Sequence, residues 1–378
     1  MMLSMKTCSV NLRRLALRAA LTSAVLPAAF AQTYTTFNVP GAFSTTPTSI
    51  NSAGDVAGYY IVDGSAGGPT LGFLRTANGT ITTFDPPGSA ETAPIGINSS
   101  GEIVGFYYAN SPVTGQMQYG FLRASDGTFT TITIPGFTLT GLSGINTAGD
   151  IGGGVGLLNP ATHEDVPLSF VLTSGGALTT YCNGIPVTGT SAYDCMNDGG
   201  FVFINDTDAI TGATAVGVGV SSFVRPYGGM TTTFRAPSKL NTFVSGVNDS
   251  GTVTGYAEND KCSRFGVFIT CTPSGLTEGF VRTSDGTLTT FQGAKLDAFA
   301  TLPTGINASG EITGSYFSIT TSTLEAHGFS RNASGVITSF DPPGSYGTTP
   351  TSINDSGVIT GSFYPGEGVG AIGFIRTP

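Results

Sequence analysis

Short stretches rich in β-branched and aromatic residues recur along the chain, separated by glycine-containing turns. Within residues 46–88, such stretches lie at 48–50, 55–60, 71–75 and 80–84. Runs of this length and composition predict β-strands, while the Asn-Ser-Ala-Gly segment at 51–54 and the Ala-Asn-Gly segment at 77–79 predict tight turns. Two prolines at 86–87 end the unit, because proline cannot donate to a strand ladder. The pattern therefore predicts four short antiparallel strands per unit.

This unit recurs seven times, and an asparagine anchors the first turn of each copy. The spacings between these asparagines are 47, 48, 59, 43, 59 and 47 residues. A four-stranded repeat of about 40 to 50 residues is the plan of a propeller blade. The anchors are Asn51, Asn98, Asn146, Asn205, Asn248, Asn307 and Asn354.

The two ends of the repeat region are complementary. The seventh copy stops after its third strand at 373–376, whereas residues 34–41 form a fourth strand with its Pro-Gly stop and no repeat before it. Pairing these ends closes a ring and removes exposed sheet edges. We therefore expect an all-β domain over residues 32–378, a seven-bladed β-propeller of four-stranded antiparallel blades closed by the N-terminal strand. An open β-solenoid is the alternative.

The repeated segments resemble the extracellular HAF-repeat family, in which a His-Ala-Phe strand accompanies a Gly-Ile-Asn-x-x-Gly-x-Ile-x-Gly segment. The Ile-Asn turn is well matched, and the His-Ala-Phe element occurs only as His-Gly-Phe at 327–329. The resemblance covers nearly all of the chain after residue 31. It implies an exported repeat protein of bacterial type, and it carries over neither an activity nor catalytic residues.

Residues 1–31 have the pattern of a secretory signal peptide. Four basic residues up to Arg18 precede an apolar run at 19–30 and a small-x-small site ending at Ala31. A membrane anchor needs about 20 uninterrupted apolar residues, and this run is shorter and contains Pro27. We therefore expect cleavage near Ala31, a mature chain without a membrane span, and a secreted or periplasmic location. The Arg13-Arg14 pair leaves the general and twin-arginine export routes open.

Composition narrows the partner classes. The chain has 55 glycines, no Trp and 10% charged residues, as expected for an all-β protein. Its net charge is −9, and removing the signal peptide would make it −13. An acidic chain repels nucleic acid and anionic membranes. We therefore expect no nucleic-acid partner, and we expect a monomer.

Four cysteines remain in the expected mature chain, and disulfides are their usual state in an exported protein. We favour Cys182 with Cys195 and Cys262 with Cys271, since each pair closes a short loop, although four cysteines allow three connectivities. A zinc site is the competitor, but the spacing is not that of a CxxC knuckle.

Residues repeated at one blade position are interpreted as scaffold. The anchor asparagines suit capped turns. Six arginines follow the phenylalanine of the third strand, and we expect each to pair with a carboxylate or carbonyl, with Asp85 and Asp341 as candidate partners.

Neither a metal nor a cofactor is predicted. His163, beside Glu164 and Asp165, and His327 are both expected in regions between second and third strands. Their blades would lie roughly 150° apart on the ring, so they cannot share a site. Residues 205–208 lack the central glycine and terminal glutamate of a calcium loop.

Loop lengths point to one functional face. Loops between strands one and two, and between strands three and four, are tight glycine turns, whereas those between strands two and three, and between blades, are long and variable. The variable set emerges on one side of the ring, here named the loop face, and variable loops on a rigid scaffold usually carry binding. The two 59-residue spacings arise from insertions on this face, each holding one cysteine pair.

The sequence thus favours a binding module for a polysaccharide, a cell-wall component or a cell-surface protein. The candidate ligand-binding residues are Tyr181, Tyr193, Asp194, Asp198, Arg235, Lys239, Glu258, Asp260, Lys261, Arg264 and Lys295. The alternative is a propeller lyase or glycosidase with paired carboxylates at the channel mouth. Acidic residues do not recur in an arrangement that predicts such a pair.

Overall fold

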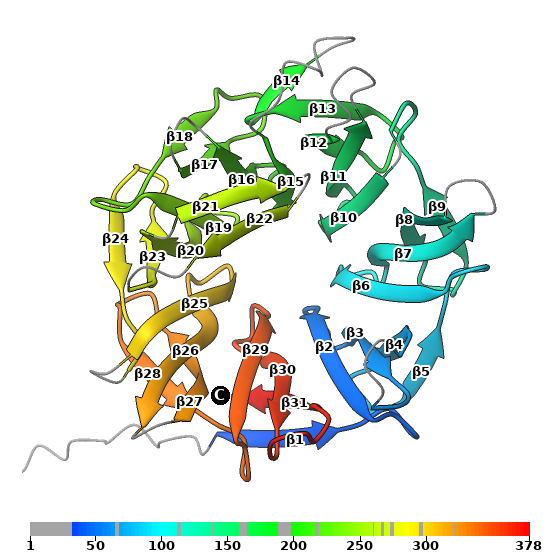
Figure 1. Ribbon diagram of the computed structural model, residues 1–378, viewed down its shortest axis with the longest axis vertical. Helices are drawn as coiled ribbons and strands as arrows, with labels where there is room; N and C mark the ends of the chain where they lie inside the picture. Colours follow the sequence, from blue (N-terminus) through cyan, green and yellow to red (C-terminus); the bar gives the residue numbers. More distant parts are fainter. Residues whose placement is uncertain are drawn as a thin grey trace, which may run out of the picture. The chain divides into compact units, whose positions relative to one another are not determined.

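The described part of the chain is built from β-strands, numbered β1 to β31. The computed structural model describes residues 32–64, 68–111, 115–137, 139–158, 165–187, 198–215, 219–259, 261–265, 268–272, 276–294, 298–320 and 323–378. These residues include no helix long and apolar enough to cross a membrane. Seven antiparallel sheets follow one another around a ring (Figure 1), so the fold is a seven-bladed β-propeller, as the repeat predicts.

Each blade takes its strands from one sequence repeat, with the seventh as the exception. Blade 1 contains β2 (Ser44–Ile50), β3 (Val56–Ile61), β4 (Thr70–Arg75) and β5 (Ile81–Phe84). Blade 2 contains β6 (Glu91–Ile97), β7 (Ile103–Ser111), β8 (Gly115–Arg123) and β9 (Phe129–Ile132). Blade 3 contains β10 (Leu139–Ile145), β11 (Ile151–Leu158), β12 (Asp165–Leu172), β13 (Leu178–Cys182) and β14 (Ile185–Val187). Blade 4 contains β15 (Asp198–Ile204), β16 (Ile210–Ala215), β17 (Val220–Arg225) and β18 (Thr232–Phe234).

The remaining blades complete the ring. Blade 5 contains β19 (Asn241–Val247), β20 (Val253–Glu258), β23 (Glu278–Arg282) and β24 (Leu288–Phe291). Blade 6 contains β25 (Ala298–Ile306), β26 (Ile312–Thr320), β27 (Thr323–Arg331) and β28 (Ile337–Phe340). Blade 7 contains β29 (Gly347–Ile353), β30 (Ile359–Tyr364), β31 (Ile372–Thr377) and β1 (Thr33–Phe37).

The ring closes by strand exchange between the two ends of the repeat region. Strand β1 pairs with β31 in antiparallel register from Thr33 opposite Thr377 to Phe37 opposite Gly373. The prediction that the N-terminal strand completes the last blade is therefore confirmed. Residues far apart in sequence are joined by this pairing, so no blade is left with three strands.

Each anchor asparagine organises its own turn. In blade 1, the N–H of Asp55 donates to Oδ1 of Asn51 at 2.9 Å, and the N–H of Gly54 donates to the Asn51 carbonyl at 3.1 Å. Gly54 has a φ of 89°, a conformation that costs glycine little because it lacks a Cβ. The side chain thus caps the turn as the sequence predicts.

The same asparagines also connect the blades in a closed circle of hydrogen bonds. Nδ2 of Asn51 donates to the carbonyl of Asn98 at 3.1 Å, and the pattern repeats around the ring until Nδ2 of Asn354 donates to the carbonyl of Asn51 at 2.9 Å. The intermediate donors are Asn98, Asn146, Asn205, Asn248 and Asn307. All seven anchors are buried. We call this set the asparagine circle; it explains why one residue type is repeated at this position.

A second repeated unit fills the space between blades. In five of the blade interfaces, the third-strand phenylalanine of one blade packs edge-on against the fourth-strand phenylalanine of the preceding blade, with ring centroids 5.9 to 6.3 Å apart. The arginine two residues later lies over that same fourth-strand ring, at 4.6 to 5.0 Å from its centroid. The sets are Phe37/Phe73/Arg75, Phe84/Phe121/Arg123, Phe234/Phe280/Arg282, Phe291/Phe329/Arg331 and Phe340/Phe374/Arg376.

These contacts correct part of the expectation for the repeated arginines. Nη1 of Arg75 donates to the carbonyl of Thr76 at 3.3 Å, and Arg123, Arg282 and Arg331 make the same contact, so a backbone carbonyl partner is confirmed for four of the six arginines. The predicted carboxylate partner is wrong for the described residues. The guanidinium of Arg75 lies over the ring of Phe37 instead, and the ion pairs among the described residues involve Lys239 and His327. Asp85 instead accepts the N–H of Gly72 at 3.4 Å. Burial lowers the pKa of Arg75, as expected for a cation covered by an apolar ring.

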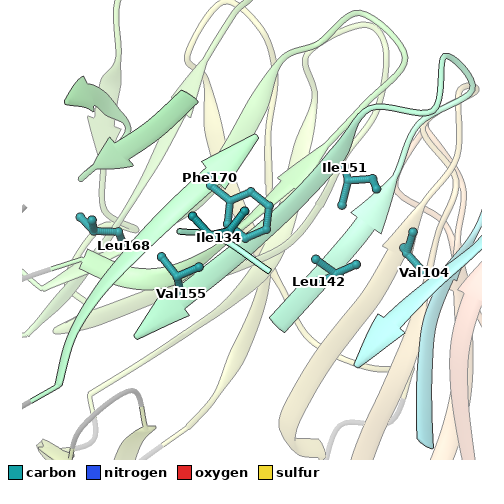
Figure 2. Close-up of a cluster of buried hydrophobic side chains, with 7 residues drawn as sticks. All are labelled: Val104, Ile134, Leu142, Ile151, Val155, Leu168 and Phe170. Atoms are coloured by element: carbon teal, nitrogen blue, oxygen red, sulfur yellow. The ribbon is translucent and has the colours of Figure 1, made fainter. Parts of the chain in front are cut away.

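The interface between blades 2 and 3 uses aliphatic side chains instead. Ile132 and Leu172 stand where five other interfaces have phenylalanine and arginine, and both pack against the buried cluster around Phe170. Figure 2 shows the fully buried part of this cluster, which includes Leu142, Val155 and Leu168. Apolar packing therefore takes the place of the cation–π contact at this interface.

Both long insertions contain strands that the repeat pattern does not predict. Strand β14 adds a fifth strand to blade 3 by pairing with β13. Strands β21 (Lys261–Phe265) and β22 (Phe268–Thr272) form a separate hairpin between β20 and β23 of blade 5.

Candidate functional site

The loop face of blade 7 carries a cavity of about 280 Å³ between blades 6 and 7. It lies where β29 begins and β30 ends, which is the side of the connection between blades and of the loop between strands two and three. The residues that line it are Phe317, Ala326, Tyr346, Gly347, Tyr364, Gly366, Glu367 and Gly368. Three aromatic rings, one carboxylate and three glycines therefore surround one small space.

Gly347, the first residue of β29, has no side chain and so helps to leave this space open. Gly347 pairs with Tyr364, and the equivalent pairs are Glu91 with Tyr108 in blade 2 and Ser44 with Ile61 in blade 1. A Cβ at Gly347 would meet only the Cβ and carbonyl oxygen of Ala326, at 3.8 and 4.0 Å. A larger residue could therefore enter the cavity without disturbing the backbone.

A hydrogen bond and nearby charges act on one tyrosine of the cavity. The hydroxyl of Tyr346 donates to Oε1 of Glu367 at 3.2 Å. The hydrogen bond and the negative charge of Glu367 raise the pKa of Tyr346, and the charge of Glu325 adds to the effect. Tyr346 therefore remains a neutral phenol whose hydroxyl is held by a carboxylate at physiological pH.

Exposed apolar side chains gather beside the cavity, on loops of blades 7 and 1. Tyr346 and Tyr364 are 42% and 45% exposed, and Phe43, Val62 and Val369 are 45% to 50% exposed. Backbone hydrogen bonds join these loops, since Thr45 donates to the Ala371 carbonyl at 2.8 Å. Clustered exposed apolar side chains mark interaction sites more often than scattered ones do.

Three of the residues proposed from the sequence lie near the junction of blades 4 and 5, where internal contacts hold them. Nζ of Lys239 forms an ion pair with Oε2 of Glu278 at 2.6 Å and donates to the carbonyl of Leu276 at 2.9 Å. Nη2 of Arg235 donates to Oγ of Ser221 at 3.0 Å. Glu258 is 7% exposed. These side chains have structural partners.

Of the other residues proposed from the sequence, four lie in strands of blades 3 and 4 and of the blade 5 hairpin, and four lie outside the described residues. Tyr181 lies in β13 and packs against the buried core that includes Phe223, in the position of a fourth-strand phenylalanine. Burial raises its pKa. Asp198 lies in β15, and Lys261 and Arg264 lie in β21. The remaining ones, outside the described residues, are Tyr193, Asp194, Asp260 and Lys295.

Strand register is compatible with one of the two predicted disulfides. Cys262 and Cys271 are directly opposite in the antiparallel pair β21–β22, where Cα atoms lie about 4.5 to 5.5 Å apart, within the range that a disulfide spans. Cys182 ends β13, and Cys195 lies outside the described residues. Both pairings remain predictions.

We expect mass spectrometry of the unreduced exported protein to detect two cross-linked peptide pairs, one joining Cys262 to Cys271 and the other joining Cys182 to Cys195. Reduction should convert each pair into its two separate peptides. A peptide joining Cys182 to Cys262 would contradict the local pairing.

The described pocket at the centre of the ring, next to the anchor turns, contains no carboxylate of the kind that the enzymatic alternative requires. Its lining consists of Thr48, Ser49, Ile95, Gly96, Ile97, Ser143, Gly144, Ile145, Phe203, Ile204, Ser245, Gly246, Val247, Thr304, Gly305, Ile306, Thr351, Ser352 and Ile353. None of these described residues ionises. A pocket with this lining offers neither a general acid nor a nucleophile for glycoside cleavage.

Asp150 and Asp208 form a carboxylate pair near the anchor turns of blades 3 and 4. Burial and the adjacent Asp150 carboxylate raise the pKa of Asp208. Both side chains hold turns, since Asp208 Oδ1 accepts from Nδ2 of Asn146 at 2.9 Å and Asp150 Oδ1 accepts from the N–H of Ser174 at 2.7 Å. These contacts give the pair a structural role on the face opposite the loop face.

His327 lies within β27 rather than in the loop region expected from the sequence. Its Nδ1 is 2.8 Å from Oδ2 of Asp341, its Nε2 is 3.6 Å from Oε2 of Glu325, and its ring stacks on Tyr316. The two carboxylates therefore meet opposite nitrogens of the ring. No group of three potential metal ligands occurs among the described residues, and His163 and Glu164 lie outside them.

Comparisons with known proteins support the fold. No family model and no curated protein sequence matches the chain. The structure is similar to selenomethionine-substituted virginiamycin B lyase from Staphylococcus aureus, with 13% identity, 92% of this chain and 100% of that chain covered, and a TM-score of 0.55. It is also similar to the β-propeller domain of the Trilobed protease from Pyrococcus furiosus, with 5% identity, coverage of 88% and 95%, and a TM-score of 0.54.

A third similar structure is acylaminoacyl peptidase from Pyrococcus horikoshii, with 7% identity, a TM-score of 0.51, and 85% of this chain but 50% of that chain covered. The Pyrococcus furiosus domain is described as having an open velcro topology, whereas β1 pairs with β31 in this chain. At these identities the likeness establishes the β-propeller fold and no activity.

Proposed function

We propose that the chain is an exported binding module of the extracellular HAF-repeat family and that it binds its ligand on the loop face of blade 7. The ligand is a glycan, a cell-wall component or a cell-surface protein. The observation that carries this proposal is the aromatic cavity between blades 6 and 7, with exposed apolar side chains beside it. The proposal moves the predicted site from the cysteine-bearing insertions to blade 7 while keeping it on the loop face.

Rigidity supports a binding role for this cavity. Tyr364 ends β30, and the N–H of Tyr346 donates to its carbonyl at 2.7 Å. Phe317 lies within β26 of the adjacent blade. Two of the three rings therefore stand on paired strands and the third directly precedes one. A preformed site of this kind loses less conformational entropy when a ligand binds.

The central pocket beside the anchor turns is lined by described residues that do not ionise, which supports binding rather than catalysis at that end of the channel. The cavity itself has one carboxylate, Glu367. Glycoside hydrolysis ordinarily requires two carboxylates that flank the bond to be cleaved. The export and family assignments rest on the sequence, namely the signal-like segment at 1–31 and the repeated Ile-Asn turns.

Alanine substitution of the cavity tyrosines tests the proposal. The mature protein is expected to bind at least one component of an array of glycans and cell-wall polymers or a cell-surface protein extract. Tyr364→Ala should weaken that binding about tenfold or more, because truncating an aromatic anchor commonly costs about 2 kcal/mol. Binding would be measured by biolayer interferometry with the purified ligand.

Tyr227→Ala is the matched control, since Tyr227 is 78% exposed and lies outside the cavity. It should bind like the wild type. A folded protein that binds nothing on the array or in the extract would contradict the binding function. Binding that is lost with Lys261→Ala or Arg264→Ala, but kept with Tyr364→Ala, would return the site to the insertion of blade 5.

A further inference from the structure

We propose that the blade 7 cavity binds an alkylammonium group, so that the ligand presents a positively charged organic group to this site. The inference rests on the proposed function, because it specifies the chemistry of the group that enters the same cavity. It is carried by three features of the lining: aromatic walls, a carboxylate and space for a small group.

The walls suit a cation with apolar substituents. Phe317, Tyr346 and Tyr364 all line the cavity. The face of an aromatic ring carries partial negative charge, and it attracts ammonium groups within about 6 Å of the ring centre. Methyl or methylene groups on the nitrogen would at the same time cover apolar ring surface that is otherwise in contact with water.

Two carboxylates lie at or near the cavity. Glu367 is a lining residue whose carboxylate accepts from Tyr346, and Glu325, whose Oε2 is 3.6 Å from Nε2 of His327, lies close enough to raise the pKa of Tyr346. The lining includes neither lysine nor arginine nor histidine. The two carboxylates would repel an anionic ligand, whereas a cation would be attracted by both the carboxylates and the rings.

The supply of hydrogen-bonding side chains argues against a neutral sugar as the group that enters. Tyr346, Tyr364 and Glu367 are the polar side chains of the lining, and the hydroxyl of Tyr346 already donates to Glu367. A sugar ring loses water from several hydroxyl groups when it is buried, and each needs a new partner. An alkylammonium group with one diffuse charge needs far fewer hydrogen-bond partners than a sugar ring does.

The volume matches a small group. A cavity of about 280 Å³ lies at the lower end of the range found for small-molecule sites, about 300 to 1,000 Å³. Glycines at 347, 366 and 368 leave this space free of side chains. The cavity is therefore large enough for a trimethylammonium head.

Choline and its uncharged isostere 3,3-dimethylbutan-1-ol provide the test, because they share one shape and differ in charge. Isothermal titration calorimetry of the mature protein is expected to show choline binding at least about tenfold more tightly than the alcohol, a difference of about 1.4 kcal/mol. Glu367→Gln should reduce choline affinity and leave that of the alcohol unchanged. Gly347→Leu should abolish binding of both by filling the cavity.

Controls separate local effects from loss of the fold. Gly347→Ser, which copies Ser44 of blade 1, tests whether a small side chain is accepted, and thermal unfolding shows whether each variant is folded. If Gly347→Leu does not fold, Tyr364→Ala with choline serves in its place and should weaken binding about tenfold.

Equal affinity for choline and the alcohol, or no binding of either at millimolar concentration, would overturn the inference. The proposed function would survive those results if the array or extract ligand still required Tyr364. A ligand that requires Tyr364 and is a neutral glycan would likewise overturn the ammonium assignment alone. The two failures are therefore distinguishable.

Discussion

Removal of residues 33–37 is expected to destabilise the propeller more than any loop deletion of equal length. The deletion takes away strand β1, its ladder with β31 and the Phe37 ring that packs against Phe73 and Arg75. Phe37→Ala alone should lower the free energy of unfolding by about 2 kcal/mol or more, because its partly buried ring packs against the core cluster that contains Phe73. Equilibrium unfolding in guanidinium chloride measures this effect.

Phe43→Ala is the control for Phe37→Ala, because Phe43 is 45% exposed and belongs to no strand. Phe43→Ala should lower the free energy of unfolding by less than about 1 kcal/mol, as substitutions of exposed residues usually do. Equal losses for the two variants would contradict the ring closure by β1. A folded and fully stable deletion variant would contradict it more strongly.

Asn307→Ala is expected to lower the free energy of unfolding by about 2 to 4 kcal/mol, because it leaves several buried groups without partners. Nδ2 of Asn307 donates to the Asn354 carbonyl at 3.1 Å, and Oδ1 accepts the N–H of Glu311 at 2.9 Å. Asn307→Asp separates the two roles, since a carboxylate keeps the acceptor of the turn but cannot donate to the next blade when ionised.

The aspartate variant also predicts a pH dependence. Its carboxylate would be buried and would face a carbonyl oxygen, so its pKa should be higher in the folded protein than in the unfolded chain. Stability should therefore be retained at low pH and lost as the pH rises through that folded-state pKa. Chemical denaturation between pH 4 and 8 would reveal this trend relative to the wild type.

Asn332→Ala is a matched control in the same blade. Oδ1 of Asn332 accepts the N–H of Val336 at 2.9 Å, so it caps a turn of the same geometry, but it is exposed. Its loss should cost less than about 1 kcal/mol. If Asn332→Ala and Asn307→Ala had equal effects, the connection between blades would contribute nothing beyond the turn.

The repeat allows the fold to be predicted because each copy contains its own turn signals. The anchor turns and the Pro-Gly stops mark strand ends, and the unmatched strand at 34–41 indicates how the ring closes. The contact partners of the repeated side chains are harder to predict from the sequence. Arg75 stacks on Phe37, which belongs to the adjoining blade, and a pattern read within one copy cannot show contacts between copies.

The proposed site is hard to predict from the sequence for a related reason. The long insertions lie in blades 3 to 5, whereas the cavity depends on small differences between the copies at positions that all of them share. Tyr346 stands where other copies have Phe43, Ala90 and Leu240, each of which donates its N–H to a carbonyl of the second strand. Aligning the copies at this position, with Gly347 beside it, would have pointed to blade 7.

The asparagine circle gives the ring no preferred starting point. Every anchor donates to the next one in chain order, and the last donates to the first. A gene rearranged so that translation began at another blade would encode the same donor and acceptor at each junction. The same bond therefore serves interfaces whose side-chain packing differs, from the phenylalanine and arginine sets of five interfaces to the aliphatic contacts between blades 2 and 3.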